Sequence, residues 1–331
     1  MRKTLLLAAA GMTAMFGGFV AQTGTARAAE QCGDVSIAQM NWAAAEVTTN
    51  IAKFLLDQGY GCNTTLVKSD TIPAITSIAE NGRPDVVTNL WLNSAGDAYL
   101  NLEKEGKIKR VAKTLVPGGV EGWWIPTYLA KEHPELTTIE GVMAHPEWVG
   151  DRFNNCPDGW GCRVVSDNLV KALNLESSGI KVFNHGSGQT LASSIASAYA
   201  DKKPWFGYYF GPTVIMGNYD MTRVKLGAYD EAKFAKLQNK DAPNPQVSDF
   251  PAAPVLTALT PAFEKDHPAE AEFFSKMSLK TATLSGLLAW QDKNKASAEQ
   301  TAVYFIQTYP DTWKTWLSED AQKKLSKLIN K

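Results

Sequence analysis

The fold is decided by residues 35–91, whose sequence is VSIAQMNWAAAEVTTNIAKFLLDQGYGCNTTLVKSDTIPAITSIAENGRPDVVTNLW. Period-2 alternation, an apolar run and helical spacing of apolar residues predict strands and helices in turn. They are expected at residues 35–40, 43–58 (capped by Asn41), 64–68, 72–80 and 85–90. This β-α-β-α-β order predicts a parallel sheet with right-handed crossovers. Ligands of such sheets bind beyond the carboxyl ends of the strands.

The rest of the chain continues the α/β pattern. Strands are expected at residues 109–115, 121–126, 180–183 and 205–209. Helices are expected at residues 138–143, 166–173, 189–200, 261–276, 278–293 and 298–308, and a long loop at 241–254. The pattern suits two α/β lobes, lobe I from residues 29–118 and 215–331 and lobe II from residues 119–214.

The N-terminus has the three parts of a secretory signal. Arg2 and Lys3 precede an apolar stretch, and Ala26-Arg27-Ala28 supplies the small-x-small cleavage pattern. Residues 1–28 are therefore predicted to be a cleaved signal peptide. No other long apolar run follows, and Cys32 is not preceded by a lipoprotein-like box. The mature chain is expected in the periplasm, without membrane insertion.

Charge and cysteine content narrow the possible partners. A net charge of −1 predicts no attraction to nucleic acid or to an anionic membrane. Four cysteines in an oxidising compartment favour two disulfides. Three pairings are possible, of which Cys32–Cys62 and Cys156–Cys162 are the local ones. Zinc is the rival use of four thiols, but paired C-x-x-C knuckles are absent from the sequence, so neither a metal nor a cofactor is expected.

Aromatic residues gather in loops rather than at core spacing. Trp42, Trp91, Trp123 and Trp160 stand in four such segments, and residues 205–212 form a fifth. Methylated ammonium groups are recognised by cages of electron-rich rings, each contributing ~2 kcal/mol when desolvated. Packing is the alternative for any one of these rings. It is the role expected for the remaining tryptophans that lie outside such loops, Trp148, Trp290, Trp313 and Trp316.

The loop Cys156-Pro-Asp-Gly-Trp-Gly-Cys162 resembles the cysteine-bracketed loop of periplasmic glycine betaine/proline betaine-binding proteins. Residues 203–212, 88–91 and the C-terminal part from Pro261 are also similar to that family, so the resemblance covers nearly the whole mature chain. The resemblance implies a two-lobed type II periplasmic binding-protein fold that closes by hinge motion. It also implies a monomer that delivers its ligand to an ABC transporter permease, with no covalent chemistry.

The same resemblance assigns site residues. Trp91 and Trp160 match rings of the family's aromatic box, and the N–H groups of Gly161 and Cys162 match donors to a polar end of the ligand. Trp42 is similar to a tryptophan of the choline-binding branch. Phe210 and Trp123 match the family less closely. Phe210 stands where proline betaine binders have a tryptophan, Tyr208 or Trp205 would compensate, and Trp123 stands where relatives have a tyrosine.

Glu121 changes the expected ligand. A carboxylate beside the cage would repel a ligand carboxylate and favour choline or the protonated oxygen of trimethylamine N-oxide. Its alternative role is that of a solvated residue at the start of a strand. Enzyme chemistry has little support, because the four histidines lack metal spacing and Ser187 lacks a Gly-x-Ser-x-Gly elbow. A receptor for a periplasmic sensor and a secreted hydrolase stand as the alternative functions.

Overall fold

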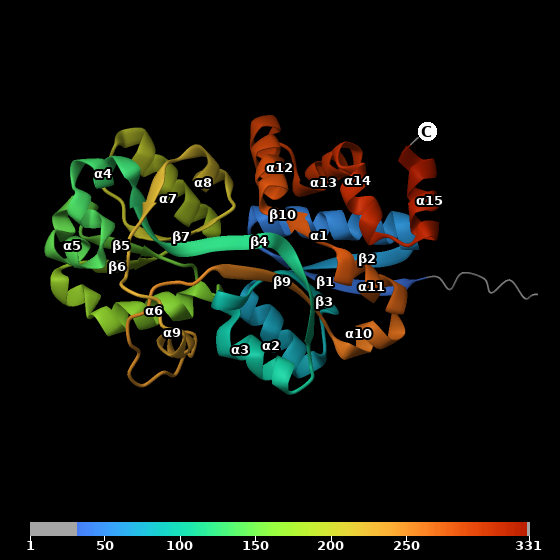
Figure 1. Cartoon of the computed structure of the whole chain (residues 1–331), viewed down its shortest axis with the longest axis horizontal. Coiled ribbons are helices and arrows are strands. Elements are labelled where there is room, and N and C mark those ends of the chain that lie inside the picture. The colour runs from blue at the N-terminus through green and yellow to red at the C-terminus, as the bar shows by residue number, and fades with distance from the viewer. Residues whose placement is uncertain (1–31, 330–331) are drawn as a thin grey trace, which may run out of the picture. The chain divides into compact units, whose positions relative to one another are not determined.

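The computed structural model describes residues 32–329, so the predicted signal peptide lies outside the described residues. Ten strands form one sheet with two sections that share the long strand β4 (Lys109–Pro126). The first section orders its strands β2-β1-β3-β9-β4, and the second β4-β7-β5-β6. Figure 1 shows β4 passing from one section to the other.

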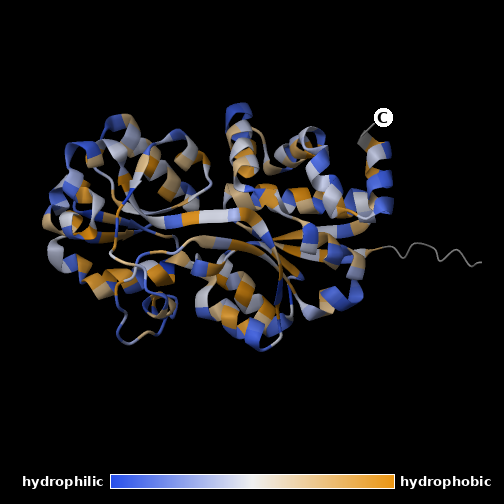
Figure 2. Ribbon diagram, viewed as in Figure 1, coloured by the Kyte–Doolittle hydropathy of each residue, from blue (hydrophilic) through white to orange (hydrophobic). Residues whose placement is uncertain are grey.

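The first section begins as the sequence predicts. Strand β1 (Gly33–Met40) pairs in parallel with β2 (Cys62–Ser69) and β3 (Val86–Trp91). Helices α1 (Ala43–Leu55) and α2 (Thr71–Asn81) form the crossovers, and in Figure 1 they lie on opposite sides of the strands. Strand β3 is buried along its length, as expected for a central strand between two helical layers, and Figure 2 shows apolar residues on the strands around it.

The helix cap predicted at residue 41 is wrong. The residue that precedes α1 is Trp42, which makes no side-chain capping bond. The side chain of Asn41 instead accepts a hydrogen bond from Trp160. The helix also ends in a π-helical turn, Leu56–Tyr60, where a continuous helix to residue 58 was expected.

A strand that the sequence analysis does not predict completes the first section. Strand β9 (Ala253–Leu259) runs antiparallel between β3 and β4, so the sheet is mixed rather than parallel. The two strands predicted around Pro117 form the single strand β4, whose pairing with β9 changes register between Leu115 and Gly119. Such irregularities allow a strand to bend without ending.

The second section supports the other half of the site. Strands β5 (Arg152–Asn155), β6 (Lys181–Asn184) and β7 (Gly207–Gly211) pair in parallel, while β7 and β8 (Met221–Arg223) run antiparallel to β4. Its helices are α4 (Thr127–Glu132), α5 (Ile139–Ala144), α6 (Cys162–Leu173), α7 (Gly188–Asp201) and α9 (Glu231–Leu237). The lobe boundaries at residues 118 and 214 stay a prediction.

The remaining helices cover the sheet and close the chain. They are α3 (Leu92–Lys104), α8 (Val214–Asn218), α10 (Pro261–Asp266), α11 (Pro268–Lys276), α12 (Thr281–Asn294), α13 (Ala298–Thr308), α14 (Pro310–Trp313) and α15 (Glu319–Ile329). A two-residue strand, β10 (Leu279–Lys280), pairs with β4. The helix expected over residues 261–276 is split at Pro268, because proline cannot continue the hydrogen-bond ladder of a helix.

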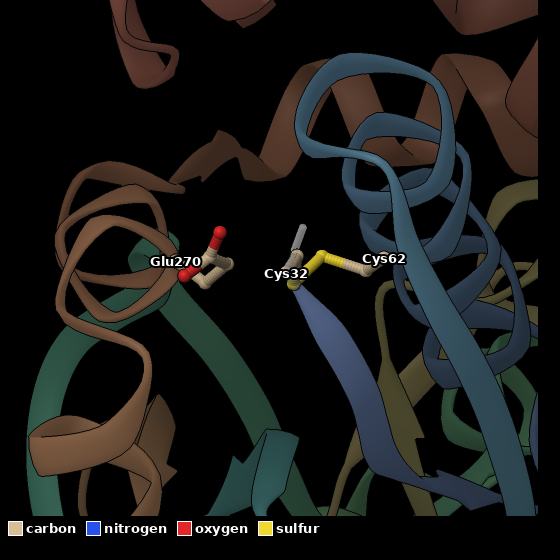
Figure 3. Close-up of side chains that lie close together, drawn as sticks. All are labelled: Cys32, Cys62 and Glu270. Carbon is tan, nitrogen blue, oxygen red and sulfur yellow. A yellow bond between two sulfur atoms is a disulfide. The ribbon is translucent and has the colours of Figure 1, made fainter. Parts of the chain in front are cut away.

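Two disulfides join the local cysteine pairs, Cys32–Cys62 and Cys156–Cys162. A carboxylate oxygen of Glu270 lies within 4.8 Å of both sulfurs of the first pair (Figure 3). Because those sulfurs are bonded to each other, they are not thiolate ligands for a metal. None of the helices in residues 32–329 is long and apolar enough to span a bilayer.

Candidate functional site

A small hollow lies where the two sheet sections meet. Its walls are aromatic rings, the start of α6 and a few polar side chains, contributed by loops and strand ends from both sections. The lining residues are Trp42, Thr71, Trp91, Ser94, Glu121, Trp160, Gly161, Cys162, Tyr208 and Phe210. Eight of the ten ligand-binding positions expected from the sequence therefore face one cavity.

Four rings form the apolar walls. Phe210 contacts each of the three tryptophans, with ring centroids 6.4 Å from Trp42, 5.3 Å from Trp91 and 5.5 Å from Trp160. The interplanar angles of these pairs are 77°, 80° and 78°, so the rings stand edge to face. Aromatic pairs favour this arrangement. The four rings together present electron-rich faces in several directions around one hollow.

The indole N–H groups are held by asparagines. Asn89 Oδ1 accepts hydrogen bonds from Nε1 of Trp42 at 3.0 Å and of Trp91 at 3.2 Å. Asn41 Oδ1 accepts one from Nε1 of Trp160 at 2.6 Å. Asn89 has a φ of 55°, a conformation that asparagine adopts more readily than most residues. Satisfying the N–H groups in this way fixes the ring planes and leaves the ring faces for a ligand.

Glu121 is the one charged side chain of the lining, and it is only 1% exposed. Its Oε1 accepts hydrogen bonds from Ser94 Oγ at 2.5 Å and Tyr208 Oη at 2.8 Å, whereas Oε2 is buried without a partner among the described residues. Burial raises the pKa of the Glu121 carboxyl, opposed by its hydrogen bonds to Ser94 and Tyr208. Contact with Glu121 adds to the effect of burial in raising the pKa of Tyr208.

The start of α6 forms a second polar part of the lining. Gly161 precedes this helix and Cys162 is its first residue, so the N–H groups here have no acceptor within the helix. The Cys156–Cys162 disulfide closes the loop that carries them. A side chain at residue 161 would come within 1.8 Å of the Ser94 carbonyl oxygen, so glycine is what permits this close approach.

Two predicted positions do not line the cavity. Trp123 packs against Phe153 and Phe206 and donates to Ser166. It lies two residues beyond Glu121 on the same strand face, about 7 Å deeper in the second section. Trp205 precedes β7, at the end away from Phe210, and donates to Ser194. Trp205 and Phe210 are five residues apart in extended chain, which places them about 16 Å from each other.

Two lining residues are absent from the sequence-based set. Thr71 begins α2, which follows β2, and Ser94 lies in the first turn of α3, which follows β3. These are positions where a parallel sheet places its ligands. That rule, applied to small hydroxyl residues as it was to tryptophans, would have found both. None of the ten lining side chains is lysine, arginine or histidine. The site thus offers π-faces and one carboxyl oxygen to a ligand, together with backbone donors.

Comparisons with known proteins agree with this architecture. The curated glycine betaine/proline betaine-binding periplasmic protein of Salmonella typhimurium is 23% identical over 252 residues, 72% of each chain. The crystal structure of a glycine betaine/L-proline-binding protein from Borrelia burgdorferi superposes with a TM-score of 0.74 at 16% identity, covering 88% of this chain and 99% of the other. An ABC-transporter choline-binding protein in complex with choline gives 0.73 at 15%, covering 90% and 98%.

These likenesses show the two-lobed α/β fold of periplasmic binding proteins, as predicted. Residues 33–308 match the family described as the substrate-binding domain of ABC-type glycine betaine transport systems. The match covers most of the chain, and the family is one of transport proteins rather than enzymes. The protein therefore belongs to the family of substrate-binding domains of ABC-type glycine betaine transport systems.

Proposed function

We propose that this protein captures a small methylated ammonium compound, of the glycine betaine/proline betaine class, for an ABC importer. The observation that carries the proposal is the cluster of Trp42, Trp91, Trp160 and Phe210 around a hollow without a basic side chain. A quaternary ammonium group cannot donate hydrogen bonds through its methyls, so ring faces supply the attraction, ~2 kcal/mol each when desolvated.

Binding is reversible capture. In an open form the two lobes expose the hollow, the ligand contacts rings from both lobes, and closure removes the cation from water. The Cys156–Cys162 loop brings Trp160 from the second section to Trp42 of the first, at a centroid distance of 5.4 Å. A ligand held between such rings would link the two lobes.

The polar groups that line the hollow support two ligand types. The N–H groups of Gly161 and Cys162 suit the carboxylate of a betaine. The unpartnered Oε2 of Glu121 suits a donor, such as the hydroxyl of choline or the protonated oxygen of trimethylamine N-oxide. Choline and trimethylamine N-oxide are therefore the second candidate ligands, and the buried Glu121 carboxyl is the observation that favours them.

The family and the sequence support the following proposed cellular setting. The protein acts as a monomer in the periplasm after removal of the signal peptide, and its closed form docks on a membrane permease. It performs no covalent chemistry, and another subunit hydrolyses ATP. A periplasmic sensor is the alternative partner.

Calorimetric titration with glycine betaine, proline betaine, choline, carnitine and trimethylamine N-oxide tests the proposal. We expect saturable binding of at least one of them, with tetramethylammonium as a weaker competitor because it has the cation without a polar end. Ammonium chloride at the same ionic strength is the matched control. Failure of all five compounds to bind would refute the proposed function.

A further inference from the structure

Residues 221–239 are attached to the second sheet section, although they follow it in the chain. Strand β8 pairs with the C-terminal part of β4, and α9 packs on α6. The buried amide of Asn168, on α6, donates to the carbonyl oxygens of Leu237 at 3.0 Å and Asn239 at 2.8 Å. These two bonds hold the backbone on both sides of Gln238.

The side chain of Gln238 reaches the first sheet section. Its Nε2 donates to the carbonyl oxygens of Leu92 at 3.3 Å and Asn93 at 2.8 Å, in the first turn of α3. This turn is followed by a kink at Gly96, whose φ is 54° and ψ is −149°. The kink interrupts the helix after its first turn. The Gln238 amide donates to two carbonyl oxygens of that turn, which precede the kink.

The approach between Gln238 and α3 is close. A Cβ atom at Gly96 would lie 2.9 Å from both Cβ and the carbonyl oxygen of Gln238. Asn93 is fixed from another side, since its amide donates to the carbonyl oxygen of Ala252 at 3.2 Å. The first turn of α3 is thus clamped between the α9 segment and the loop that leads into β9.

The clamped turn carries a wall of the cavity. Ser94 follows Asn93, donates its hydroxyl to Glu121 and places its carbonyl against Gly161. Gln238 itself does not line the cavity. We infer that Gln238 is a positioning residue that joins the two sheet sections outside the ligand site and keeps the ligand-bound, closed form from opening.

This inference rests on the proposed function, because it requires that the protein binds a ligand. Gln238 would slow the release of that ligand and would not select among ligands. Removing the bridge should speed opening, so the dissociation rate of the ligand should rise while the association rate is unchanged. The preference between ligands should also be unchanged, since Gln238 touches none of them.

The test uses Gln238→Glu, which has the same shape but presents a carboxylate to two carbonyl oxygens, and Gln238→Met, which has neither donor nor charge. Gln246→Glu is the matched control, an exposed residue in the loop that follows. Stopped-flow dissociation of choline and of glycine betaine should be about tenfold faster in both Gln238 variants, the equivalent of losing ~1.4 kcal/mol. Wild-type dissociation rates in both variants would overturn the inference.

Hydrogen exchange of the ligand-free protein separates this inference from the proposed function. Without the bridge, amides in the first turn of α3 should exchange faster in both Gln238 variants, with global unfolding midpoints unchanged and Gln246→Glu like wild type. This readout needs no ligand. If neither probe binds wild type, the proposed function loses support, while unaltered exchange in α3 would still reject the bridge.

Discussion

Asn89 and Trp42 are joined by a hydrogen bond of 3.0 Å from the indole Nε1 to the amide oxygen, and the same oxygen accepts from Trp91. One buried side chain therefore sets the orientation of two rings that come from different strand ends. The Asn89 amide in turn donates to Thr48 at 3.3 Å, which fixes the oxygen toward the indoles.

Asn89→Gly should weaken ligand binding about tenfold, because two indole hydrogen bonds, each ~0.5–1.5 kcal/mol, would be lost. Glycine accepts the φ of 55° at this position without strain, so the variant removes the side chain alone. Calorimetry gives the affinity, and near-ultraviolet circular dichroism reports the tryptophan environment. Unchanged affinity would mean that packing alone orients the two rings.

Trp160→Ala should reduce affinity by at least about 30-fold, since it removes one cation–π wall of ~2 kcal/mol. Trp290→Ala is the control, because Trp290 stacks on Tyr304 at 4.1 Å and lies outside the cavity lining. Thermal unfolding of the ligand-free proteins checks that both fold. Equal affinity of Trp160→Ala and wild type would remove the cage from the mechanism.

Glu121→Gln should weaken choline and trimethylamine N-oxide about tenfold to hundredfold and glycine betaine far less. The carboxylate makes a charge-assisted hydrogen bond with a donor, worth ~1.5–3 kcal/mol, and repels a ligand carboxylate. Competition calorimetry with the three ligands gives the ratios. Parallel losses for all three would show that Glu121 supports the cavity without selecting its ligand.

Burial raises the pKa of the Glu121 carboxyl above its ordinary value. The ligand-free fold therefore binds a proton more tightly than the unfolded chain does. This contribution to stability is complete below the unfolded pKa and is lost as the pH rises through the raised pKa. Urea unfolding from pH 4 upward should show this decline, and Glu121→Gln should flatten it. Choline affinity should rise over the same window, because a cation favours the ionised form.

The first section was predictable because its pattern is local. Alternation in β1, helical spacing in α1 and the apolar run of β3 each specify one element without reference to distant residues. Strand β9 was not predictable in this way. The Pro- and Asn-rich loop predicted at residues 241–254 covers its first residues. Its place between β3 and β4 also depends on antiparallel pairing with both of these distant strands.

The site was predictable to the extent that strand ends define it. Trp42 follows β1 and Trp91 is the last residue of β3, as the rule for parallel sheets requires. Trp205 was expected only to compensate for Phe210, and it does not meet the rule, because it lies at the entry of the expected strand and precedes β7. The bonds to Asn89 and Asn41 could not be predicted, since they depend on side-chain directions that the sequence pattern does not contain.

Gly188→Ala should weaken binding strongly although residue 188 carries no side chain in the wild type. A Cβ atom there would lie 2.4 Å from Cζ2 of Trp160, so the indole would have to leave its position. Gly186→Ala is the matched control, two residues away and with no atom within 4 Å of the added methyl. Neither glycine has a positive φ, so backbone strain does not separate the two variants. We expect affinity to fall about tenfold or more for Gly188→Ala alone, because overpacking costs ~1–3 kcal/mol and here displaces a cage wall. Equal affinities of the two variants by calorimetry would mean that Trp160 can shift without losing contact with the ligand.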